Sequence, residues 1–159
     1  MDKKDLIKAF QRKNKKVLAT MRENRTYDKA KWHIEEVEKL GLNYLRAYAH
    51  AGMVLAWAVE RDLVSEELKT GFKASLDGYK LKELLPSQLL EACGEVLSSE
   101  QFSLPAKQFL DTYYDKGFFP DYLQVVSKGQ SDYDVEESKD NISRVFEILD
   151  QRFHEFSQK

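Results

Sequence analysis

The sequence predicts a single all-α domain of about seven to nine helices, packed around a buried central helix at about residues 43–62. Residues 47–59 read AYAHAGMVLAWAV and contain one ionisable side chain, His50. A helix that is apolar on nearly every face has to be buried on nearly every face. The chain has only three Pro and seven Gly, which favours long helices. No segment alternates β-branched and polar residues, so we expect no sheet.

The composition fits one folded domain. Its 159 residues, 42% of them hydrophobic, are enough to bury a core without disulfides. Cys93 is the single cysteine, so neither an internal disulfide nor a cysteine metal site is expected. Residues 1–5 lack the apolar stretch of a secretory signal, and the longest apolar run is shorter than the ~20 residues that cross a bilayer. We therefore expect a cytoplasmic protein that does not act at a membrane.

Charge is distributed unevenly along the chain. The net charge is −2, but residues 1–25 hold nine Lys and Arg against three Asp and Glu, which leaves the remainder with a balance of about −8. We divide the chain into a basic N-terminal helix, residues 1–25, and an all-helical domain, residues 26–159. The basic helix has the charge of a nucleic-acid-binding element. The acidic domain would repel phosphates, so binding of nucleic acid is disfavoured.

Capping signals place the first helices of the domain. Residues 28–40 have apolar side chains at helical spacing, and Gly41 is a plausible C-cap. Asn43 can cap the central helix. Ser65, followed by two Glu, begins a helix that we expect to stop at residues 77–78.

The second half of the chain continues in short helices. Residues 79–85 are expected to form one or two helical turns, and a further helix begins at Pro86. Another begins at residues 103–105 and is followed by a turn at residues 117–120. After a short helix at 121–126 we expect an acidic loop at 128–137 and a last helix from Ser138 to about Phe156.

Histidine supplies the sharpest candidates for chemistry. His50 lies inside the apolar central helix, where it can be a tuned base or a pH sensor, or a neutral core residue. His33 and His50 can form a pocket with Trp57, or a two-histidine site with Asp28 or Glu60. The histidines lie 17 positions apart, without the close ligand spacing that is typical of zinc sites. We therefore expect no metal and no cofactor.

No catalytic motif is present. The sequence contains no Gly-rich phosphate loop, no Gly-x-Ser-x-Gly elbow and no His-Glu-x-x-His helix, so we assign no catalytic residue. The loop before the last helix is dense in acidic residues but lacks the Gly and Glu positions of a calcium loop. It is either a solvated connection or a surface that attracts a basic partner. Its candidate partner-binding residues are Asp132, Tyr133, Asp134, Glu136, Glu137 and Asp140.

Two segments resemble a known group of proteins. Residues 27–33 (YDKAKWH) and 47–57 (AYAHAGMVLAW) are similar to a family of small bacterial proteins of unknown function, whose members carry a similar YDKAKWH segment and a Y-x-H-x-G helix. The resemblance covers about Tyr27 to the C-terminus. Its members resemble immunity proteins, the small cytoplasmic partners that neutralise bacterial toxin domains encoded beside them. It carries over no catalytic residues.

These observations lead to one principal expectation and two alternatives. We expect a non-enzymatic protein-binding module, an immunity protein that neutralises a cognate bacterial toxin by stoichiometric binding. An acidic domain suits a basic toxin, as nucleases tend to be, because complementary charge raises the association rate. The alternatives are a small-ligand-binding or catalytic helical domain centred on His50, and a nucleic-acid-associated regulator that uses the basic N-terminal helix.

Overall fold

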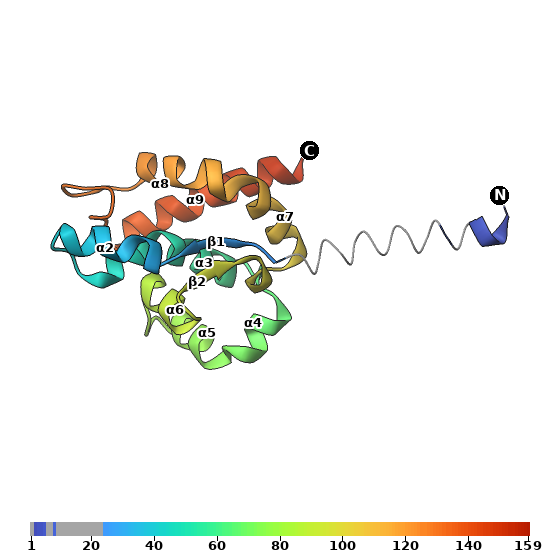
Figure 1. Ribbon diagram of the computed structural model, residues 1–159, viewed down its shortest axis with the longest axis horizontal. Coiled ribbons are helices and arrows are strands. Elements are labelled where there is room, and N and C mark those ends of the chain that lie inside the picture. The colour runs from blue at the N-terminus through green and yellow to red at the C-terminus, as the bar shows by residue number, and fades with distance from the viewer. Residues whose placement is uncertain (1, 6–7, 9–23) are drawn as a thin grey trace.

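The computed structural model describes residues 2–5, 8 and 24–159, so the expected basic helix at residues 1–25 lies mostly outside the described residues. The described chain is mainly helical, as the sequence predicts (Figure 1). Its α-helices are α2 (Lys31–Lys39), α3 (Ala49–Glu60), α4 (Glu66–Gly71), α5 (Lys73–Lys80), α6 (Pro86–Ala92), α7 (Leu104–Tyr113), α8 (Phe119–Val125) and α9 (Lys139–Ser157). Shorter helical turns are η1 (Tyr44–Ala47), η2 (Ser99–Gln101) and a π-turn, η3 (Tyr114–Phe118).

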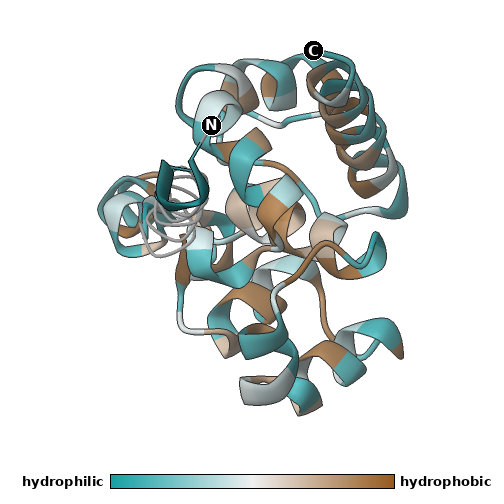
Figure 2. Ribbon diagram, turned by 90° about the vertical axis from the view of Figure 1, so that its right-hand side faces the viewer, coloured by the Kyte–Doolittle hydropathy of each residue, from teal (hydrophilic) through white to brown (hydrophobic). Residues whose placement is uncertain are grey.

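Helix α3 is the buried centre of the fold. Every residue from Ala49 to Val59 is buried, which confirms the prediction from its apolar sequence. In Figure 1, α8 and α9 lie on one side of it, and α4, α5 and α6 lie on the other. Helix α9 packs on α3 with one apolar face, where Val145, Phe146 and Leu149 are buried. Hydrophobic residues accordingly recur along α9 in Figure 2.

A two-stranded antiparallel sheet joins distant parts of the chain, and the expectation of no sheet was wrong. Strand β1 (Thr26–Lys29) pairs with β2 (Val96–Ser98), with Thr26 opposite Ser98 and Lys29 opposite Val96. Strands of four and three residues are too short to show an alternating pattern in the sequence. The sheet holds the start of the domain against the segment between α6 and α7, and Figure 1 shows the two strands crossing in front of α3.

Several helix ends agree with the capping signals. The side chains of Asn43, Ser65 and Ser138 each accept a hydrogen bond from a backbone N–H of the turn that follows. Gly41 has a φ of +70°, and the backbone bonds from Gly41 to Glu38 and from residue 42 to residue 37 close the end of α2. A left-handed residue that ends a helix in this way is typically glycine.

Several boundaries differ from the sequence prediction. The central helix expected at about 43–62 is divided into η1 and α3, so Asn43 caps η1, and the first residues of the helix expected at 28–40 belong to β1. The single helix expected from Ser65 to residues 77–78 is broken at Phe72 into α4 and α5, and α5 continues to Lys80. The turn expected at residues 117–120 is the π-turn η3, which runs directly into α8. Pro120 is compatible with this helical segment because it stands in the first turn of α8, where proline is tolerated.

Among the described helices, none is both long and apolar enough to cross a membrane.

Candidate functional site

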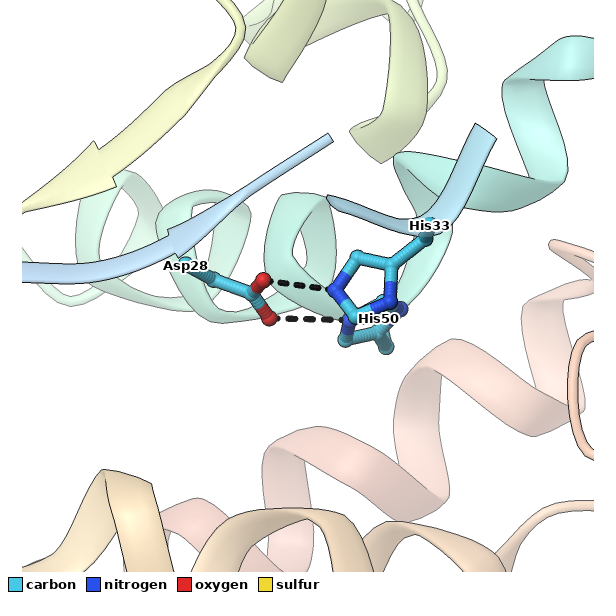
Figure 3. A group of neighbouring side chains, drawn as sticks. All are labelled: Asp28, His33 and His50. Carbon is cyan, nitrogen blue, oxygen red and sulfur yellow. Dashed lines mark hydrogen bonds and ion pairs between the residues drawn. The ribbon is translucent and has the colours of Figure 1, made fainter. Parts of the chain in front are cut away.

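Three side chains from separate elements meet under the surface of the domain (Figure 3). Asp28 comes from β1, His33 from the first turn of α2 and His50 from the first turn of α3. The His33 Nε2 atom lies 2.6 Å from Asp28 Oδ1, and His50 Nε2 lies 2.9 Å from Asp28 Oδ2. A carboxylate can only accept, so both imidazoles donate from Nε2. We call these three residues the Asp–His–His cluster.

Two further donors complete the surroundings of the Asp28 carboxylate. The Tyr114 hydroxyl donates to Oδ2 at 2.6 Å, and the backbone N–H of Lys29 donates to Oδ1 at 2.9 Å. Burial alone would raise the pKa of Asp28. The hydrogen bonds from His33, His50 and Tyr114 outweigh that effect and hold the pKa well below its usual range. The cluster therefore contains a buried, ionised carboxylate at neutral pH.

The two histidines differ in their access to solvent. The His50 side chain is 4% exposed, whereas that of His33 is 22% exposed. Their rings meet edge to face with centroids 4.7 Å apart. His33 Nδ1 is hydrogen-bonded to the Tyr133 hydroxyl at 2.6 Å, so Tyr133 lies over the outer side of the cluster. His33 therefore connects the buried carboxylate with the surface.

The two tyrosines that contact the cluster, Tyr114 and Tyr133, are hydrogen-bond partners rather than nucleophiles. Burial and the charge of Asp28 raise the pKa of Tyr114 well above its normal value. Burial and the nearby Glu36 carboxylate also raise the pKa of Tyr133. Both phenols are therefore neutral at pH 7. Within the described residues neither histidine is hydrogen-bonded to a serine hydroxyl or a cysteine thiol, so no nucleophile–base pair of the triad type is formed there.

Trp57 does not join the two histidines. It stands two turns after His50 on α3 and is fully buried. Its Nε1–H donates to Asp150 on α9 at 2.8 Å, and its ring packs against Phe109 and Phe153. Of the predicted pocket residues, the structure brings His33 and His50 together and places Trp57 in the core between α3, α7 and α9.

A shallow groove of about 400 Å³ lies beside the cluster. Tyr133 connects the groove with the cluster, because it lines the groove and its hydroxyl is bonded to His33. The remaining lining residues come from α2, the start of α8 and the 128–137 loop: Glu36, Leu40, Phe119, Ser131 and Asp132. A wider hollow of about 1040 Å³ lies against the two strands and α4, away from the histidines.

The acidic residues predicted to bind a partner do not form one uniform surface. Asp132 is exposed and pairs with Lys128 at 2.7 Å, and Glu136 and Asp140 are also exposed. Asp134 folds back on the loop and accepts a hydrogen bond from the backbone N–H of Gln130. Asp132 and Tyr133 are the members of the predicted set that line the groove.

Glu137, another member of the predicted partner-binding set, is bonded to the first turn of α6. Its carboxylate accepts hydrogen bonds from the backbone N–H and the hydroxyl of Ser87, both at 2.6 Å, and thereby fixes the first turn of α6. We expect Glu137→Ala to lower the free energy of unfolding by about 1–3 kcal/mol, because Ser87 is fully buried and loses its acceptor. Glu136→Ala is the matched control and should change it by less than about 0.5 kcal/mol. Urea denaturation checks both values, and equal effects would contradict this role for Glu137.

The comparisons with known proteins identify a family but no characterised relative. The model of a family described as a domain of unknown function (DUF7832) matches residues 26–135. The chain belongs to this family. No curated protein and no solved structure matches the chain. The matched span of the DUF7832 domain contains all three residues of the Asp–His–His cluster as well as Tyr114 and Tyr133, and it ends before α9.

Sequence reasoning found the two histidines but not the full cluster. Asp28 was one of two carboxylates considered beside them, and the spacing of the three residues gave no preference for it. Tyr114 lies 86 positions from Asp28, and Tyr133 lies 100 positions from His33. Contacts of that separation leave no periodic signal in a single sequence. The segment YDKAKWH, which carries the family resemblance, was the one local feature that contains both Asp28 and His33.

Proposed function

We propose that this DUF7832 protein is a non-enzymatic binding protein, an immunity protein that neutralises a cognate toxin by stoichiometric contact. The observation that carries the proposal is an exposed stripe on α2 beside the groove. Trp32 and Glu36 lie on α2, and Leu40 is the C-cap residue that directly follows it; the three are spaced at intervals of four residues, so they share one face. Trp32 is 57% exposed and Leu40 is 45% exposed. Glu36 and Leu40 also line the groove.

The chemistry of this surface suits a basic protein partner. Aromatic residues are enriched at the centres of protein interfaces, and a large exposed tryptophan is a typical energetic anchor. The stripe and the groove add the carboxylates of Glu36 and Asp132. Residues 26–159 carry a balance of about −8, so the whole domain attracts a positively charged partner over a distance. The resemblance to immunity proteins supports the same proposal.

The position of the Asp–His–His cluster favours binding over catalysis. His50 is enclosed by the rings of Phe119, Tyr122 and Tyr133, with centroids 5.4–6.2 Å away. A substrate in the groove would meet Tyr133 before either imidazole. The cluster instead fixes β1, α2 and α3 relative to one another, and α2 carries the proposed interface.

Variants of the stripe test the proposal. Trp32→Ala should weaken binding of the toxin by about 2 kcal/mol, or roughly 30-fold, because an exposed anchor is lost. Glu36→Lys should slow association with a basic partner. The matched controls are Leu81→Ala and Glu83→Lys, which change exposed residues at the end of α5 and after it.

Binding is measured by surface plasmon resonance and protection by growth of cells that express the toxin, with melting temperatures recorded for every variant. If the stripe variants and the control variants bind equally well, this face is not the interface.

A further inference from the structure

We propose that the Asp–His–His cluster is a divalent metal site that takes Zn²⁺ or a related transition-metal ion. One carboxylate and two imidazoles are donors that zinc prefers. One ligand atom from each of Asp28, His33 and His50 lies within 4.8 Å of the others. Both histidines present Nε2 to the same carboxylate, each to a different oxygen, so the three donors face one another (Figure 3).

The donors lie near enough together to hold an ion after local movement of their side chains. Bonds of about 2.0–2.1 Å in a tetrahedral site place neighbouring ligand atoms about 3.3 Å apart. The two N–O distances, 2.6 and 2.9 Å, join the imidazoles to different oxygens of Asp28. Because one ligand atom from each residue lies within 4.8 Å of the others, the distances between donors would change by up to about 1.5 Å. His33 is partly exposed, which leaves its side chain room to adjust. Three protein ligands leave a fourth position for water.

The residues around the donors match the outer shell of a metal site. A ligating histidine usually donates its second ring N–H to another group, which fixes the orientation of the ring. The His33 Nδ1 atom lies 2.6 Å from the Tyr133 hydroxyl. With an ion on Nε2, the ring proton of His33 would sit on Nδ1 and would be donated to that oxygen. Ligating carboxylates are hydrogen-bonded in turn. Asp28 receives bonds of this kind from Tyr114 and the Lys29 backbone. The proposal concerns these residues alone and does not depend on the proposed toxin partner.

Calorimetric titration of the full chain with Zn²⁺ tests the site, after treatment with a chelator and dialysis. We expect one ion per chain. His33→Gln and His50→Gln each remove a ligand, so each should weaken binding by more than the roughly 100-fold that loss of an outer-shell partner can cost. His154→Gln is the matched control, because His154 is exposed on α9 and remote from the cluster in sequence. It should bind Zn²⁺ as the wild type does. A wild type that binds no stoichiometric Zn²⁺, or one whose affinity is unchanged by both cluster variants, overturns the proposal.

A milder variant keeps the test decisive if the histidine variants fail to fold. Tyr133→Phe removes one oxygen and leaves all three ligands in place. Its affinity for Zn²⁺ should fall about 10-fold, as is typical when the outer partner of a ligating histidine is lost. Zn²⁺ should also raise the melting temperature of the wild type, because an ion that binds only the folded state stabilises it. An unchanged affinity in Tyr133→Phe, together with an unchanged wild-type melting temperature, counts against the site.

Discussion

Asp28→Asn is expected to lower the free energy of unfolding by about 3–5 kcal/mol, which is the typical cost of removing one member of a buried charged network. Asp28 accepts bonds from His33, His50 and Tyr114, and the side chains of the last two are deeply buried. An asparagine offers one acceptor oxygen, and its amide group would face a donor. Asp77→Asn is the matched control, because Asp77 pairs with Lys73 on the surface of α5. Its cost should stay below about 1 kcal/mol.

The same variant should show a defined dependence on pH. The pKa of Asp28 is lower in the folded protein than the value of about 3.9 expected in the unfolded chain. The carboxylate therefore contributes stability that is fully present above pH about 4 and is lost as the pH falls through the folded-state pKa. The difference in unfolding free energy between wild type and Asp28→Asn should shrink below pH about 4. Urea denaturation across the acid range measures it. A difference that stays constant would mean that the charge of Asp28 is not what stabilises the cluster.

Gly52→Ala is expected to destabilise the domain by about 1–3 kcal/mol or more, because it overfills the contact between α3 and α6. A Cβ atom at Gly52 would overlap the Pro86 carbonyl oxygen and lie 3.0 Å from the Ser87 nitrogen. These are backbone atoms, so the helices themselves have to separate. Gly71→Ala is the matched control at the end of α4, where an added Cβ meets nothing within 4 Å. It should be neutral or stabilise by up to about 1 kcal/mol. Thermal unfolding compares the two, and equal effects would contradict close packing at Gly52.

The sequence predicted the helical architecture because its signals are local. The apolar run of α3 dictates its burial. The caps are local as well, because Asn43, Ser65 and Ser138 each accept a hydrogen bond from a backbone N–H two or three residues further along the chain. The sheet was missed for the opposite reason. Its two strands are separated by about 70 residues in the sequence and contain few residues each, so neither strand carries a pattern that predicts its pairing with the other.

The candidate site was predictable only in part. An ionisable residue in an apolar helix singled out His50, and the YDKAKWH segment contained His33. Their common partner, Asp28, is set by the position of β1 over α3, which depends on the sheet that the sequence did not reveal. The acidic loop was recognised from its composition. Composition does not distinguish Asp132, which faces solvent, from Glu137, which is bonded to buried Ser87.

Co-expression tests the proposed function most directly. The tagged chain is expressed with the product of each gene that flanks its own, and growth and complex formation are recorded with and without the chain. We expect one neighbour to stop growth when it is expressed alone. It should be harmless with the wild-type chain, form a 1:1 complex with it by size-exclusion chromatography with light scattering, and regain toxicity with Trp32→Ala. If every flanking product is harmless when expressed alone, or if protection occurs without a complex, the proposal of an immunity protein is contradicted.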